Sequence, residues 1–307
     1  MNFSTATLIA NAKQTKRFCF DSVLTIGHLN LNISAAEQRT LFEHYASLAG
    51  ARSFPTNGYA NDFLKLIAGA SCVSSLDYSS YEDCDIVHDL NKPISAELRG
   101  RFDAVVDGGC LEHIFDVPTA LHNYASLVKT DGSIIIATVA NNHMGHGFYQ
   151  FSPELFFNYF SVANGFDLQE VIVVAHPYPS AGLSSRMEFY DVIDPRIASG
   201  RTGLVSNLPV MIMVHAVKRG NWTAARPHLV QSDYEAMFQA RDQIAQRTSA
   251  TAELKIGLTG RGWLFAKQIA KYLPASVRSF LTGKLELRRN SLRNTRIYRR
   301  RGPFHLE

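Results

Sequence analysis

The stretch Arg101-Phe-Asp-Ala-Val-Val-Asp-Gly-Gly-Cys-Leu-Glu-His-Ile-Phe-Asp116 decides the fold of this 307-residue chain. Residues 102–106 are a short apolar run that ends in a glycine turn, a pattern typical of a buried strand followed by a loop. Other short apolar runs precede and follow it, and segments with helical periodicity lie between them. This alternation predicts a parallel sheet covered by helices.

Working outward, the same criteria predict the neighbouring elements. Strands are expected at 23–26, 72–76, 86–87 and 133–139. Helices are expected at Ser34–Glu37, a capping box leading to about Leu48, at 60–68, after Asp116 with Pro118, and after Ser152-Pro153. The apolar runs 166–175 and 208–217 have no convincing helix between them, so we expect them to be antiparallel neighbours.

Residues 102–116 resemble the fourth strand and following loop of class I S-adenosylmethionine-dependent methyltransferases, where an "FD-hydrophobic-hydrophobic" strand leads into an "LEH" loop. Ser75-Leu-Asp77 and Ile86-Val-His-Asp-Leu90 add to the resemblance, which covers roughly residues 20–217. It implies an α/β, Rossmann-like doubly wound sheet with a reversed last strand, and S-adenosylmethionine as cofactor. Residues 1–219 are the expected methyltransferase-like domain, with insertions at about 29–57 and 176–207, and 220–307 a basic helical C-terminal extension.

The chain differs from the family at the first strand. The family has an acidic residue and a Gly-x-Gly-x-Gly loop there, whereas this sequence reads Leu24-Thr-Ile-Gly27-His-Leu-Asn30. We interpret residues 29–57 as an insertion that splits the cofactor loop into Gly27 and Gly58.

In an open α/β sheet, ligands bind beyond the carboxyl ends of the strands. The resemblance implies that Asp77 accepts hydrogen bonds from the ribose hydroxyls, that Asp89 and Leu90 flank adenine, and that small residues after Asp107 leave room for the methyl group. An aspartate after a strand is alternatively a turn or cap residue. The full set of expected cofactor contacts is Gly27, His28, Gly58, Tyr59, Asp77, Tyr78, Asp89, Leu90, Asp107, Gly108 and Gly109.

The segment Asn141-Asn-His-Met-Gly-His-Gly-Phe-Tyr-Gln-Phe-Ser152 is the candidate acceptor site. His143 or His146 has the chemistry of a general base for a hydroxyl proton, although either is alternatively a structural histidine. Glu112 and His113 orient the cofactor or the acceptor, or only cap their loop. Polar side chains crowded in this way form either a hydrogen-bond network or a binding site. The candidate acceptor contacts are Asn141, Asn142, Tyr149 and Gln150.

These residues suit a polyhydroxyl acceptor, and Phe148, Tyr149 and Phe151 offer rings that stack on a sugar face. The predicted function is therefore O-methylation of a hydroxylated small molecule such as a sugar or glycan. The alternative is a non-catalytic binding or scaffold protein that kept the fold after losing its glycine loop.

Other functional classes lack their sequence signals. The available metal ligand types have no tight spacing, so no metal site is predicted; they are Glu112, His113, Asp116, His143, His146 and His176. The chain has no dinucleotide fingerprint, no P-loop and no nucleophile elbow. Hydrophobic residues make up 46% and charged residues 19%, which excludes a disordered chain.

Localisation and partners follow from cysteine spacing and charge. The four cysteines form no C-x-x-C pair, which favours a reducing cytoplasm. Residues 284–301 contain eight Lys or Arg against one acid, after an apolar stretch at 263–273. This combination suits peripheral contact with an anionic membrane at its inner face, or a solvated surface whose apolar residues pack on the main domain. Nucleic acid is not an expected partner, since no recognition motif accompanies the cations.

Overall fold

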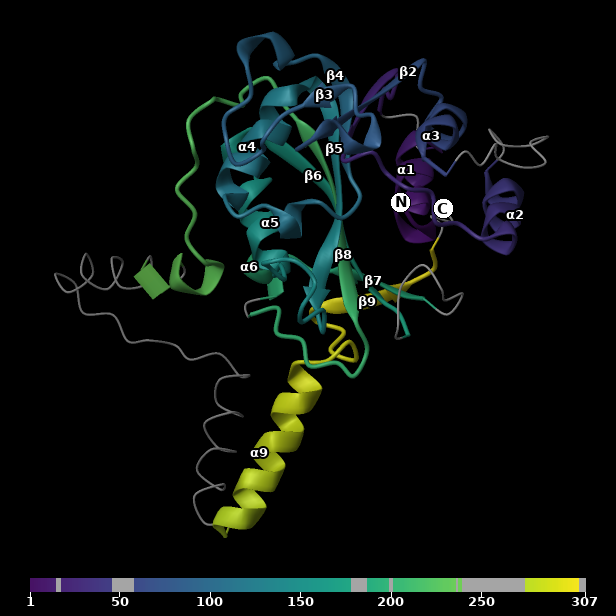
Figure 1. Ribbon diagram of the computed structural model, residues 1–307. Helices are drawn as coiled ribbons and strands as arrows, with labels where there is room; N and C mark the ends of the chain where they lie inside the picture. Colours follow the sequence, from purple (N-terminus) through teal and green to yellow (C-terminus); the bar gives the residue numbers. More distant parts are fainter. Residues whose placement is uncertain are drawn as a thin grey trace, which may run out of the picture.

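The computed structural model describes residues 1–14, 18–45, 58–177, 187–198, 201–235, 237–238 and 274–303. Its centre is a nine-stranded sheet in the order β3-β2-β1-β4-β5-β8-β6-β7-β9 (Figure 1). The strands are β1 Ser22–Ile26, β2 Cys72–Asp77, β3 Ile86–Val87, β4 Phe102–Asp107, β5 Val128–Asn141, β6 Phe166–Ala175, β7 Glu188–Val192, β8 Val210–Lys218 and β9 Tyr298–Arg301.

Strand direction confirms the Rossmann-like prediction. β1 to β5 pair in parallel, whereas β8 runs antiparallel to both of its neighbours, β5 and β6. The pairing of β6 with β8 is the predicted antiparallel neighbour relation. In the central strands, Ile26 pairs with Leu76 on one side and with Asp107 on the other. The carboxyl ends of β1, β2 and β4 therefore lie at one edge of the sheet.

Helices cover both faces of the sheet, as expected of a doubly wound fold. In Figure 1, α1, α2 and α3 lie on one side and α4, α5 and α6 on the other. The buried side chains form two clusters, one with α1 and α3 and one with α4 and α5. The helices are α1 Phe3–Gln14, α2 Ala35–His44, α3 Asn61–Ala68, α4 Val117–Leu127, α5 Pro153–Tyr159, α6 Pro195–Ala198 and α9 Ala275–Arg289.

The predicted helix starts are confirmed by their caps. Ser34 and Glu37 form the reciprocal capping box of α2, and the side chains of Asp116 and Ser152 accept backbone N–H groups at the starts of α4 and α5. Each cap satisfies N–H groups that the first turn leaves without a partner. α2 ends at His44, and the predicted continuation to Leu48 falls partly at 46–57, outside the described residues.

Helix α1 is an element that the sequence analysis missed. Ten of its twelve residues are buried, including Ser4 and Thr7, so it lacks the polar face that identifies an amphipathic helix. The sequence signal for this helix is Asn2. Its side-chain oxygen accepts hydrogen bonds from the backbone N–H of Thr5 and from the hydroxyls of Ser4 and Thr5. This is the geometry of a helix N-cap.

The C-terminal region corrects the expected basic helical extension. Arg299, Arg300 and Arg301 are not helical, because they form β9 and pair with β7 in the main sheet. The guanidinium of Arg301 lies 2.8 Å from the carboxylate of Asp191, and Arg300 contacts Glu188 at 3.1 Å. The sequence analysis predicted that these arginines contact a membrane or lie on a solvated surface. It did not predict β7, their pairing partner, which lies within the expected insertion at 176–207.

Helix α9 projects away from the sheet (Figure 1). It carries exposed Phe280 and Leu285 together with Lys284 and Arg288. The apolar stretch 263–273 lies outside the described residues, so contact with an anionic membrane stays a prediction. Within the described chain, no helix has both the length and the hydropathy to cross a bilayer.

Candidate functional site

Gly27 and Asp77 lie beside each other where β1 and β2 end, at the carboxyl edge of the sheet. Gly27 follows β1 with φ of 76°, and its N–H donates to the carbonyl of Leu76. A side chain built on Gly27 would begin 3.8 Å from Oδ2 of Asp77. Glycine adopts this left-handed conformation without strain. Because Gly27 has no side chain, its backbone and the Asp77 carboxylate are not separated by a Cβ.

The predicted split of the glycine loop agrees with the local geometry. Leu31 donates its N–H to the carbonyl of Gly58, and Asn30 and Tyr59 form an antiparallel bridge. The ring of His28 stacks on Tyr59, with 3.6 Å between centroids and 10° between planes. These contacts hold the two ends of the insertion together beside the end of β1.

Asp77 presents an available carboxylate. Its side chain is partly exposed, and Oδ1 accepts the N–H of Tyr78 at 2.5 Å. Among the described residues, no hydrogen bond to Oδ2 is formed. The Tyr78 side chain is 74% exposed next to it. A ligand hydroxyl therefore has an acceptor at the position predicted for the ribose.

Asp89 and Leu90 have contacts within the protein that account for their positions without a ligand, so their predicted roles stay predictions. The carboxylate of Asp89 accepts the backbone and side-chain N–H groups of Asn91 and lies 3.3 Å from the Lys92 ammonium. The bonds from Asn91, followed by Lys92, hold the pKa of Asp89 below its usual value. Leu90 is buried in the core cluster that includes helix α4. Asp89 closes its own turn, the alternative reading of a strand-end aspartate.

Asp107 is a second correction, because its side chain is fully enclosed. Its two carboxylate oxygens accept the N–H groups of Gly109, Cys110 and Leu111 and the hydroxyl of Tyr124. Burial, together with the negative charge of Glu112, raises the pKa of Asp107 to about 7. It cannot reach a cofactor, and instead it fixes the loop that carries Glu112.

The two glycines after Asp107 have reasons in the protein itself. A Cβ on Gly108 would lie 3.0 Å from the side chain of Leu29, and Gly109 has φ of 120° beside Glu112. Small residues were predicted here to leave room for the methyl group. In the structure, their small size also lets residues 27–31 pack closely against the loop.

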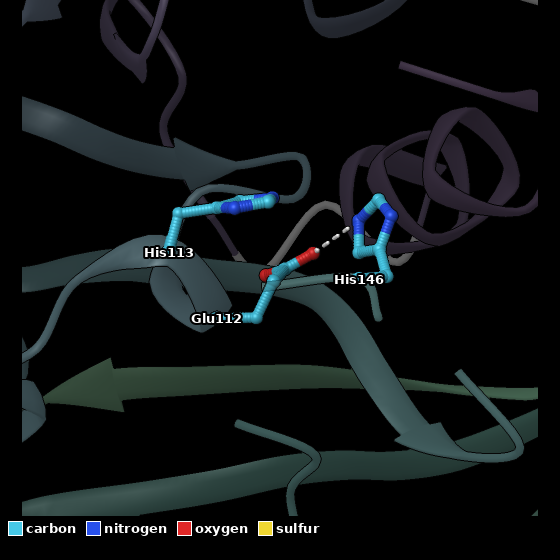
Figure 2. Close-up of side chains that lie close together, drawn as sticks. All are labelled: Glu112, His113 and His146. Carbon is cyan, nitrogen blue, oxygen red and sulfur yellow. Dashed lines mark ion pairs between the residues drawn. The ribbon is translucent and has the colours of Figure 1, made fainter. Parts of the chain in front are cut away.

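Beyond this loop, Glu112, His113 and His146 come together (Figure 2). Glu112 and His113 lie in the short 3-10 helix η4 Leu111–His113, and His146 comes from the loop after β5. The Glu112 side chain is only 1% exposed, and Oε2 accepts the Thr138 hydroxyl at 2.7 Å. Its Oε1 lies 3.4 Å from Nε2 of His146. Three of the four predicted catalytic residues therefore form one cluster.

Backbone contacts place His146 over Glu112. The carbonyl of Glu112 accepts the N–H of Phe148 at 2.7 Å. Gly145 and Gly147 on either side of His146 both have positive φ, and a Cβ on Gly147 would lie 2.6 Å from that carbonyl. The two glycines thus make the tight turn that brings the imidazole to the carboxylate.

His143, the fourth predicted catalytic residue, lies deeper and contacts His176. The two ring centroids are 5.4 Å apart, and Nε2 of each ring is buried without a hydrogen-bond partner. Burial, with smaller effects from His176 and His146, lowers the pKa of His143 to about 4, and burial also lowers the pKa of His176. Both imidazoles are therefore neutral near pH 7.

The predicted acceptor-binding residues form a network within the protein. Asn141 and Asn142 donate to carbonyls of residues 204–208, Gln150 accepts the N–H of His143, and the Tyr149 hydroxyl donates to the carbonyl of Phe115. This is the alternative to a binding site that the sequence left open. Their side chains hold the loop around the cluster in place.

An aromatic surface beside the cluster was predicted only in part. Phe148 is 69% exposed as expected, whereas Phe151 is buried in the core. Phe115, which the sequence analysis did not select, is 72% exposed and packs edge-on against Phe148 with centroids 6.0 Å apart. Its position two residues after His113, close to the "LEH" residues, was the signal that could have identified it.

No family model and no curated protein sequence matches this chain. It is similar in structure to the YcgJ protein from Bacillus subtilis, at 12% identity and a TM-score of 0.39, over 71% of this chain and 99% of that one. A Burkholderia thailandensis 1,6-didemethyltoxoflavin-N1-methyltransferase, with bound S-adenosylhomocysteine, matches at 15% identity and 0.33, over 70% and 76%. A SAM-dependent methyltransferase from Aquifex aeolicus matches at 9% and 0.33, over 66% and 86%.

At these identities and TM-scores, the likenesses support no inference about what the chain binds or does. The fold assignment rests on the sheet itself, that is, on its strand order and on the reversed strand β8 between β5 and β6. That arrangement is the Rossmann-like sheet with a reversed strand implied by the resemblance to class I methyltransferases.

Proposed function

We propose that this protein is an S-adenosylmethionine-dependent methyltransferase that methylates a hydroxyl of a sugar-like or glycan acceptor. One observation supports the proposal. Gly27 and Asp77, where β1 and β2 end, lie at the same edge of the sheet as the cluster of Glu112, His113 and His146. We infer that these strand ends hold the cofactor next to a reactive set of side chains.

The cofactor side of this edge suits S-adenosylmethionine. Gly27 lets the backbone approach a ligand without a Cβ between them. Oδ2 of Asp77 is the acceptor for a ribose hydroxyl. The bound cofactor would supply an electrophilic methyl group on a sulfonium. Every residue in this fit lies on β1, β2 or the turns that follow them.

The acceptor side is the surface formed by Phe115 and Phe148 next to the cluster. Exposed aromatic side chains in contact with each other are unusual on a monomer surface and suit a ligand with an apolar face. The bound cofactor would supply the methyl group and its sulfur would keep the bond pair of the broken carbon–sulfur bond, while the cluster would take up the proton of the acceptor hydroxyl. The chain contributes positioning and promotes this proton loss.

The competing proposal is a scaffold protein that no longer binds a cofactor. Calorimetry with S-adenosylhomocysteine separates the two. We expect wild-type protein to bind, and Asp77→Ala to weaken binding by about 10- to 150-fold, the scale of hydrogen bonds to a charged group. Asp89→Ala is the matched control, since its carboxylate closes its own turn and should leave binding unchanged. Absence of binding to wild-type protein at millimolar ligand would exclude the methyltransferase function.

A further inference from the structure

We propose that Glu112, His113 and His146 form a binding site for a divalent metal ion of the zinc or cobalt type. One carboxylate oxygen and one nitrogen of each imidazole lie within 4.8 Å of one another. The Glu112 carboxylate lies between the two imidazoles (Figure 2). Two histidines and a glutamate are a known ligand set of catalytic zinc sites, which keep a further position open. Sequence analysis named these three residues as available ligand types but predicted no metal site, because they come from two separate loops and have no tight spacing.

The closest pair of ligand atoms already has the spacing that an ion requires. Oε1 of Glu112 and Nε2 of His146 are 3.4 Å apart. Two ligands on a tetrahedral ion with bonds of about 2.0–2.1 Å lie about 3.3 Å from each other. A direct charge-assisted hydrogen bond would be shorter, at about 2.7–2.9 Å. The observed separation is therefore compatible with two ligands on one ion.

The burial of Glu112 adds a second argument. Its side chain is 99% inaccessible to solvent, and a buried carboxylate is costly unless it is paired or coordinates a metal. Thr138 occupies Oε2 and leaves Oε1 directed at His146. A ligating carboxylate whose second oxygen is held by a hydrogen bond is the usual arrangement around protein-bound metals.

The two histidines differ in how far they are fixed. His146 is held by the tight turn between Gly145 and Gly147, whereas His113 is exposed on η4. We expect the exposed His113 side chain to adjust when the ion binds. With a single oxygen ligand from the protein, the cluster suits zinc or cobalt better than magnesium, which binds through oxygen.

A metal ion here would specify how the proposed reaction loses its proton. An ion with an open position lowers the pKa of a bound hydroxyl and orients it. That role depends on the proposed methyltransferase function, whereas metal binding itself does not.

The test uses the full-length protein with any affinity tag removed, after treatment with a chelator. Titration with Co²⁺ is followed by visible d–d absorption, and Zn²⁺ then competes for the site. We expect one equivalent to bind. His146→Ala, His113→Ala and Glu112→Gln should each weaken binding by at least about 10- to 100-fold. His122→Gln is the control, because this imidazole lies against Trp222, outside the cluster.

Glu112→Gln keeps an oxygen for the Thr138 hydroxyl, so its far-ultraviolet circular dichroism and unfolding midpoint should stay close to those of wild type. The metal site would be overturned if Co²⁺ did not bind to wild-type protein, or if it bound to Glu112→Gln and His146→Ala as tightly as to wild type. Calorimetry with S-adenosylhomocysteine in the presence of chelator is run in parallel. Cofactor binding without metal binding refutes this inference alone, and metal binding without cofactor binding refutes the proposed function alone.

Discussion

Asp77 and Asp107 end neighbouring regions of the same sheet, one at β2 and one at β4, and they have opposite surroundings. Asp77 is partly exposed and keeps Oδ2 available, whereas Asp107 is completely buried and accepts four hydrogen bonds. A strand-end position alone therefore does not identify a binding residue. The deciding quantity is how many donors the protein itself already provides to the carboxylate.

The two histidines of the loop after β5 repeat this contrast. The side chain of His146 is 53% exposed and faces Glu112. His143 has a buried Nε2 and packs against the buried ring of His176. We expect the enclosed residues to maintain the fold and the open residues to act on ligands, and four predictions test this division on protein stability.

The largest effect is expected for Asp107→Ala. This change removes the acceptor of three backbone N–H groups and of the Tyr124 hydroxyl, of which the Leu111 N–H and the Tyr124 hydroxyl are buried. We expect the free energy of unfolding to fall by about 3 to 5 kcal/mol, measured by urea denaturation. Tyr124→Phe removes only one of these bonds and should cost about 1 kcal/mol. A loss of less than about 1 kcal/mol for Asp107→Ala would contradict its structural role.

Gly147→Ala should have the next largest effect. The new Cβ would lie 2.6 Å from the backbone carbonyl of Glu112 and would require an unfavourable positive φ. We expect a loss of about 1 to 3 kcal/mol. Gly145→Ala is a matched control, because φ is also positive there but no atom lies within 4 Å of the added carbon. Equal losses in the two variants would mean that the loop is not docked on Glu112.

His143→Gln should change how stability depends on pH. Burial lowers the pKa of His143 from 6.5 to about 4, so the unfolded chain binds a proton more readily than the folded one. Its contribution to stability is therefore present above pH 6.5 and lost as pH falls towards 4. Allowing for the partial exposure of the ring, wild type should lose roughly 1 to 2 kcal/mol more than the variant over this range.

Urea unfolding of both proteins at several pH values measures this difference. Subtracting the variant's free energy of unfolding from that of wild type at each pH removes the contribution of the other titrating groups. Nuclear magnetic resonance titration of the His143 ring gives an independent value. A midpoint near 6.5 would place His143 among the open residues and would reverse its assignment.

The sequence predicted the strands because each is an apolar run bounded by turns, and it predicted helix starts because Ser34, Asp116 and Ser152 are strong local caps. It could not predict β7 and β9. Their pairing joins segments more than a hundred residues apart, and Arg299–Arg301 looks like a solvated charge run. For the site, residue type and strand-end position selected Glu112 and His146, which the structure brings together, and Asp77, whose role in binding stays a prediction. They could not separate Asp77 from Asp107, because hydrogen-bond donors such as Tyr124 come from elsewhere in the fold.

The smallest effect on stability is expected for Asp77→Ala, and this prediction tests the comparison from the other side. The only hydrogen bond that the described protein gives the Asp77 carboxylate is the N–H of Tyr78, next to it in the chain. A partly exposed turn residue of this kind should change the free energy of unfolding by no more than about 0.5 kcal/mol. The same variant should bind S-adenosylhomocysteine more weakly than wild type, because Oδ2 is the acceptor left for a ligand. If Asp77→Ala instead destabilises the protein as much as Asp107→Ala does, both carboxylates are structural. The available oxygen at the end of β2 would then no longer support a binding site.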